Sequence, residues 1–99
     1  MYQDFFSGFI KIHILHHAKE EPVYGKYLID ELASHGYRVS PGTIYPVLHD
    51  MQKKGYLSRK ERNVEGRIRK YYTITNHGLT ALEETKAKIR ELMKEVMDE

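Results

Sequence analysis

The order of hydrophobic and polar positions along the chain predicts three helices, then two short strands, then a last helix. Helical periodicity places the four helices at about residues 4–19, 23–35, 41 to a stop at Gly55, and 76–97. Alternation predicts strands over residues 56–63 and 67–74, joined by a turn at residues 64–66 in which Gly66 is free to take a positive φ. The chain therefore predicts a mainly helical α+β fold.

Several residues mark the ends of these helices. Ser40 is a hydroxyl N-cap followed by Pro41 at the first helical position, and Thr75 caps the last helix in the same way. Gly36 stands where a left-handed residue ends a helix. Pro46 lies inside the third helix, close to its start, so we expect a local irregularity there rather than a break.

The first and last helices are more apolar than a small monomer needs. In the first helix, about half the circumference is covered by Phe5, Phe6, Phe9, Ile10, Ile12 and Ile14. A helix of this kind is buried on more than one side. In the last helix, spacings of three, seven, four and three join Leu79, Leu82, Ile89, Met93 and Val96 into a heptad-type seam that Lys86 interrupts.

These two helices predict an interface between two subunits rather than packing within one. A chain of 99 residues with 40% hydrophobic residues and a mean hydropathy of -0.63 has a modest core, and small domains often add to theirs by oligomerising. We expect a homodimer, with an interface that includes Phe5, Phe6, Phe9, Ile10, His13, Leu79, Leu82, Ile89, Met93 and Val96.

Composition and the absence of certain motifs exclude several other classes of protein and of binding site. The chain has no cysteine, which excludes disulfides and thiolate metal sites. It has no apolar run near the roughly 20 residues that span a bilayer, and its N-terminus lacks the basic segment of a leader peptide. We therefore expect a cytoplasmic protein that does not enter the membrane. There is no glycine-rich phosphate loop, nucleophile elbow or paired carboxylate, so we expect neither an enzyme nor a cofactor.

Positive charge is concentrated in the middle of the chain. Residues 41–74 carry eight Lys/Arg and three Asp/Glu, whereas the flanking segments are slightly acidic and the whole chain has a net charge of +2. A basic block between acidic flanks predicts a contact surface for a polyanion. A solvated basic hairpin is the alternative interpretation.

Three helices followed by a hairpin is the order of a winged helix-turn-helix. We expect residues 1–74 to form this DNA-binding domain and residues 75–99 a dimerisation helix, as one compact unit. The third helix would enter the major groove and the hairpin would contact phosphates. The candidate DNA-binding residues are Gly42, Thr43, Tyr45, Pro46, His49 and Lys53 on the helix, and Arg59, Lys60, Arg67, Arg69 and Lys70 on the hairpin.

Four motifs resemble the PadR family of bacterial transcription regulators. They are Tyr24-Gly25, the run SPGTIYPVL at 40–48, GYL at 55–57, and GRIRKYYTIT at 66–75 with Gly78 after it. The resemblance covers about residues 9–82 and is to the shorter members, which have one helix after the wing. It implies a homodimer that represses transcription from palindromic operators and is released by a small-molecule effector. The planar-drug pocket of some members uses an aromatic residue on the last helix, and this chain has no Phe, Tyr or Trp after Thr75.

Two alternatives remain open from the sequence. The basic hairpin could bind an acidic protein partner, which would make the chain a winged-helix interaction module without specific DNA binding. His13 and His17, with His16 beside them, could hold a metal ion and make the regulator a metal sensor, although they lack the zinc-protease pattern and a third ligand. Neutral core or interface histidines with a pH effect on the dimer are the other interpretation of this group.

Overall fold

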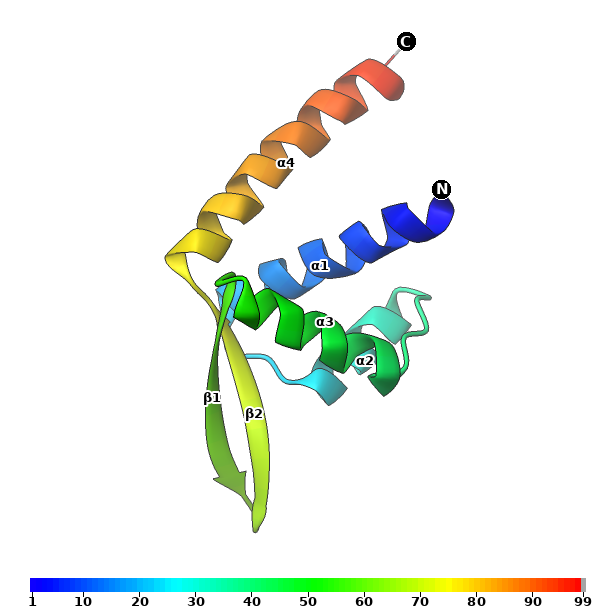
Figure 1. The fold of residues 1–99 in the computed structure, drawn as a ribbon. Coiled ribbons are helices and arrows are strands. Elements are labelled where there is room, and N and C mark those ends of the chain that lie inside the picture. Colours follow the sequence, from blue (N-terminus) through cyan, green and yellow to red (C-terminus); the bar gives the residue numbers. More distant parts are fainter. Residues whose placement is uncertain (99) are drawn as a thin grey trace.

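The elements follow one another in the predicted order in a computed structural model, which describes residues 1–98 (Figure 1). They are α1 (Tyr2–Glu20), α2 (Gly25–Ser34), α3 (Pro41–Lys53), β1 (Leu57–Val64), β2 (Arg67–Ile74) and α4 (Asn76–Val96). The first three helices pack together, and the hairpin and α4 extend in opposite directions from the point where they join. The predicted winged helix-turn-helix is confirmed. Among the described residues, no helix has the length and apolar character needed to cross a membrane.

The core lies where α1, α2 and α3 meet the base of the hairpin and the first turns of α4. Its buried hydrophobic side chains are Ile10, Ile14, Leu15, Ala18, Val23, Leu28, Leu32, Val39, Ile44, Leu48, Met51, Leu57, Tyr72 and Leu82. In α1, both Ile14 and Leu15 are buried although neighbouring positions on a helix point in different directions. The helix is therefore covered on more than one side, as its composition predicts.

The hairpin is a two-stranded antiparallel sheet in which Asn63 pairs with Ile68 and Val64 with Arg67. The turn contains only Glu65 and Gly66, at φ 52° and 82°. Positive φ at both central residues is the geometry that matches the twist of the flanking strands. The prediction that Val64 belongs to the turn is therefore wrong by one residue, because a two-residue turn lets Val64 remain in the strand.

The predicted start of α2 is also wrong. Val23 is extended and forms a short antiparallel bridge with Tyr72 of β2: its N–H donates to the Tyr72 carbonyl at 2.9 Å, and the Tyr72 N–H donates back at 2.7 Å. Because its backbone groups bond to the strand, they cannot begin a helix. The bridge joins the entry to α2 to the base of the wing.

The capping predictions have different outcomes at the two hydroxyl residues. The Thr75 hydroxyl accepts a hydrogen bond from the Gly78 N–H at the start of α4, as predicted. Ser40 occupies the N-cap of α3, but its hydroxyl makes no bond to a helix N–H and lies 3.5 Å from the Thr43 hydroxyl. The α3 helix continues through Pro46 without a break, and Gly36 after α2 is left-handed at φ 88°.

Candidate nucleic-acid interface

One side of α3 is buried and the other is open to solvent. Ile44, Leu48 and Met51 face the core. All six positions predicted on this helix as DNA-contacting are exposed: Gly42, Thr43, Tyr45, Pro46, His49 and Lys53. A helix with this division presents small and polar side chains from its first turns, which is where recognition helices meet base edges.

The basic residues of the wing are divided between its two faces. Strand register places Arg62 opposite Arg69 and Lys60 opposite Tyr71, so these side chains share one face. Arg59, opposite Tyr72, and Lys70, opposite Glu61, lie on the other face. Arg69 and Lys70 are both candidate DNA contacts, and their side chains point to opposite faces, as the alternation of strand residues predicts. The wing is therefore basic on both faces.

A groove of about 640 Å³ lies between the start of α2, the start of α3 and the tip of the hairpin. Of the predicted DNA-contacting residues, it brings together Tyr45, Arg67, Arg69 and Lys70. Gly42, Thr43, Pro46, His49, Lys53, Arg59 and Lys60 do not line it. Three further lining residues come from the start of α2 and are absent from the predicted site: Tyr24, Gly25 and Lys26. Tyr24-Gly25 is one of the four motifs that resemble the PadR family, but nothing in the local sequence connects it with the wing.

Arg69 is held against aromatic rings inside this groove. Its guanidinium carbon lies 4.2 Å from the centre of the Tyr24 ring, a cation–π contact. Hydrogen bonding to Tyr71 raises the pKa of the Arg69 guanidinium further above its ordinary value, so the side chain stays charged. The Arg62 guanidinium lies 5.1 Å from the Tyr71 ring on the same face.

The residues predicted to form a dimer interface occupy three environments. Phe5, Met93 and Val96 are 65%, 54% and 58% exposed. Ile10 and Leu82 lie in the core of the chain itself. The others are partly buried: Phe6, Phe9, His13, Leu79 and Ile89. Phe6 and Phe9 both pack on Tyr37, with ring centres 5.5 and 5.0 Å away.

The histidines of α1 form a cluster with the end of α2. His17 and His35 both lie beside one carboxylate oxygen of Glu31, with nitrogen–oxygen distances of 3.5 and 3.1 Å. The His13 ring centre lies 5.5 Å from that of His35 and 6.1 Å from that of His17. Burial, and then the neighbouring histidines, lower the pKa of His13; burial also lowers the pKa of His17, against the opposing effect of Glu31. Within residues 1–98, no three His, Cys, Asp or Glu side chains are placed to hold a metal ion.

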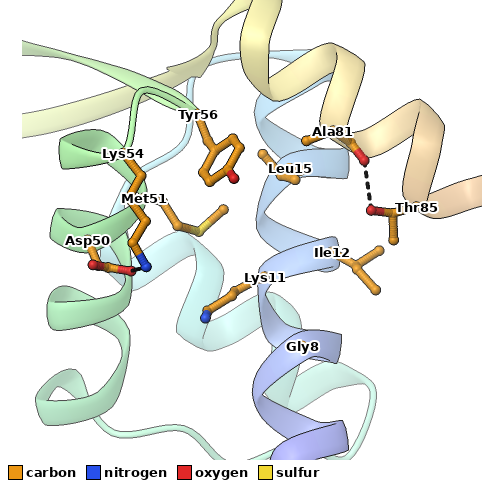
Figure 2. A pocket seen from close by; sticks show the side chains of 10 residues that line it. All are labelled: Gly8, Lys11, Ile12, Leu15, Asp50, Met51, Lys54, Tyr56, Ala81 and Thr85. Carbon is orange, nitrogen blue, oxygen red and sulfur yellow. Dashed lines mark hydrogen bonds and ion pairs between the residues drawn. The ribbon is translucent and has the colours of Figure 1, made fainter.

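A second hollow, of about 360 Å³, lies between α1, α3 and α4 (Figure 2). Its inner wall is apolar and includes Ile12, Leu15 and Met51. Lys11 and the ion pair of Lys54 with Asp50, at 3.0 Å, also line it. We call this hollow the inter-helix cleft.

An exposed helix beside a basic two-stranded wing, carried on a core of packed helices, defines the winged helix-turn-helix class. Residues 14–84 match the transcriptional regulator PadR-like family. The transcriptional regulator Rv3488 of Mycobacterium tuberculosis is 44% identical over 95 residues, which cover 96% of this chain and 89% of that protein.

Solved structures of similar proteins have the same fold. A PadR-like transcription factor from Bacteroides fragilis has a TM-score of 0.85 at 29% identity, covering 96% of this chain and 93% of its own. A PadR family transcriptional regulator from Eggerthella lenta has a TM-score of 0.85 at 31% identity, covering 97% and 85%. The chain belongs to the PadR-like family, and it is a transcriptional regulator rather than an enzyme.

Proposed function

We propose that the chain acts as a homodimeric repressor that binds a palindromic operator. The observation that carries this proposal is the placement of Tyr45, from the exposed side of α3, in the same groove as Arg67 and Arg69 of the wing. Base edges are read by side chains on the helix, while the phosphate backbone attracts the basic wing. Thr43 is also exposed on α3 and would contribute to base contact beside Tyr45.

The dimer is supported by apolar side chains that the single chain leaves uncovered. Besides Phe5, Met93 and Val96, the exposed apolar side chains include Leu92 near the end of α4 and Met97 directly after it. No residue of α4 after Leu82 is buried. A second copy would cover these side chains, with residues 1–74 as the DNA-binding part and α4 as the dimerisation helix. Two-fold symmetry then requires an inverted repeat with half-sites about one helical turn apart.

A small-molecule effector would occupy the inter-helix cleft. The cleft touches α3, which carries the candidate base contacts, and both helices of the proposed dimer interface. Its apolar wall and the neighbouring Lys11 fit a largely apolar molecule with an acidic group. A ligand there would lower the affinity for the operator if it binds more tightly to a dimer whose two α3 helices are spaced differently from those of the operator-bound dimer.

Selection from a randomised duplex library at two salt concentrations tests the proposal. We expect enrichment of an inverted repeat and an affinity that falls steeply with salt. The variant with both Thr43→Ala and Tyr45→Ala is the matched control, because it keeps every basic residue and should bind without enriching the repeat. If the wild type binds in a salt-sensitive way but enriches no sequence, the proposal that Thr43 and Tyr45 read bases would be wrong. No binding at either salt would favour the protein-interaction module instead.

A reporter with the enriched repeat placed over a promoter tests the direction of regulation. We expect lower expression when the protein is present. Higher expression would show an activator and would contradict repression.

A further inference from the structure

Two adjacent residues at the start of α2 each face a side chain that the proposed DNA site uses. Tyr24 lies under the Arg69 guanidinium of the wing, and Gly25 lies against the Tyr45 ring of α3. We propose that the Tyr24-Gly25 pair is a positioning element that fixes Arg69 and Tyr45 in their DNA-contacting orientations before DNA arrives. The inference rests on the proposed function, because the role it assigns to Tyr24 and Gly25 is in DNA binding.

The backbone bridge between Val23 and Tyr72 determines where Tyr24 lies. Two hydrogen bonds join Val23 to Tyr72 at the base of the wing, so the next residue must lie beside β2. Tyr24 is the N-cap of α2, with an extended φ and ψ of -134° and 163°. Its ring meets the Tyr71 ring edge to face, with centres 5.4 Å apart. Arg69 precedes Tyr71 by two positions on the same face of β2, and it therefore reaches the Tyr24 ring.

Gly25 is required for space rather than for an unusual backbone conformation. It is the first residue of α2, is buried, and has no positive φ. A Cβ at this position would lie 2.6 Å from Cζ and 2.8 Å from the hydroxyl oxygen of Tyr45. These distances are shorter than any real Cβ contact, so an alanine would displace the ring. Glycine weakens a helix, and here its absent side chain allows the close approach of Tyr45.

Fixing these two side chains in the free protein favours binding. An arginine that is mobile before binding loses rotamer freedom when it contacts a phosphate, and this loss weakens the complex. Arg69 is already restricted by Tyr24 and Tyr71, and both rings leave its charge exposed to the groove. Tyr45 is half exposed, with one part of its ring packed on α2 and the rest open to solvent.

The first experiment measures the coupling between Tyr24 and Arg69 in operator binding. Wild type, Tyr24→Leu, Arg69→Ala and the double variant are compared by equilibrium titration over a range of salt. We expect Tyr24→Leu to weaken binding roughly tenfold and to flatten the salt dependence as Arg69→Ala does. The double variant should be no weaker than Arg69→Ala alone, because the ring acts only through the arginine. Tyr24→Phe keeps the aromatic face and should bind like the wild type.

The second experiment applies the same design to Gly25 and Tyr45. Gly25→Ala should reduce discrimination between operator bases, and it should have no further effect when Tyr45 is already alanine. Gly8→Ala is the matched control: Gly8 lies in α1, and a Cβ there would meet no atom within 4 Å. We expect this control to preserve both affinity and base preference.

A third measurement uses the free protein and needs neither DNA nor a destabilising variant. The Tyr24 ring should shift the NMR resonances of the Arg69 side chain away from their random-coil positions. Comparison with the spectrum of the Arg69→Lys variant identifies which resonances belong to Arg69. Random-coil positions in the wild type would overturn the positioning of Arg69.

The outcomes separate the two proposals. Additive losses in the double variants, with a wild type that binds its operator, would overturn the positioning element and leave the regulator intact. A wild type that binds no duplex would overturn the proposed function and, with it, any positioning for DNA.

Discussion

The Thr75 hydroxyl accepts a hydrogen bond from the Gly78 N–H at 3.0 Å and donates its own proton to the Gly55 carbonyl. The Thr75 N–H also donates to the Tyr56 carbonyl at 3.1 Å. One residue therefore joins the end of α3, the approach to the wing and the first turn of α4. The direction in which α4 leaves the winged helix-turn-helix is set at this point.

Thr75→Val should destabilise the protein by about 1–2 kcal/mol, since valine keeps the shape but leaves the Gly78 N–H and the Gly55 carbonyl without their partner. Urea denaturation at a fixed protein concentration measures the change. Thr75→Ser keeps the hydroxyl and should remain close to the wild type. Equal stability of the valine variant would show that water replaces both bonds.

Lys70→Ala should weaken binding to all duplex sequences to a similar degree. If each subunit loses one phosphate contact, the slope of log affinity against log salt should become shallower by about 2 per dimer. Lys88→Ala removes the same charge from the exposed side of α4 and should leave the slope unchanged. A slope for Lys70→Ala equal to that of the wild type would remove this face of the wing from the DNA site.

Met93→Glu should weaken the proposed dimer at least about tenfold, because a second subunit would bury the new charge without a partner. Sedimentation over a range of protein concentrations measures the shift towards monomer. Ala87→Glu is the matched control, since it adds the same charge to α4 at an exposed position outside the seam. If both variants dimerise like the wild type, α4 does not form the interface.

The parts of the structure that the sequence predicted correctly are those encoded by neighbouring residues. Helical periodicity identified α1 and α4, and a capping hydroxyl marked the start of α4. The position of Val23 could not be predicted in this way. Its backbone bonds to Tyr72, which is distant in the sequence, and no local pattern carries that information.

The same limit applies to the candidate site. The exposed side of α3 follows from its periodicity, and charge pointed to the wing. The contact of Tyr24 with Arg69, and the space that Gly25 leaves for Tyr45, depend on how α2 and the hairpin pack. Strand alternation did separate Arg69 from Lys70, because adjacent positions in a strand face opposite sides.

Acidification should destabilise the folded chain through the histidine cluster. Burial lowers the pKa of His13 and of His17 in the folded state, whereas the unfolded chain binds protons near the ordinary histidine value of about 6.5. The unfolded state therefore takes up protons first as the pH falls. Stability should be complete above about pH 7 and decrease progressively below pH 6.5. Glu31 opposes this trend by favouring protonated His17, but burial is the largest influence on both groups.

Urea denaturation between pH 8 and 5.5 measures this dependence, in a range where most carboxylates stay ionised. His13→Gln should flatten the decline, because glutamine cannot take up the proton that the folded cluster disfavours. His49→Gln is the matched control, since His49 is exposed on α3 and away from the cluster, and it should keep the wild-type dependence. Stability that rises on acidification would mean that the attraction of Glu31 for His17 and His35 outweighs burial and the repulsion among the four histidines.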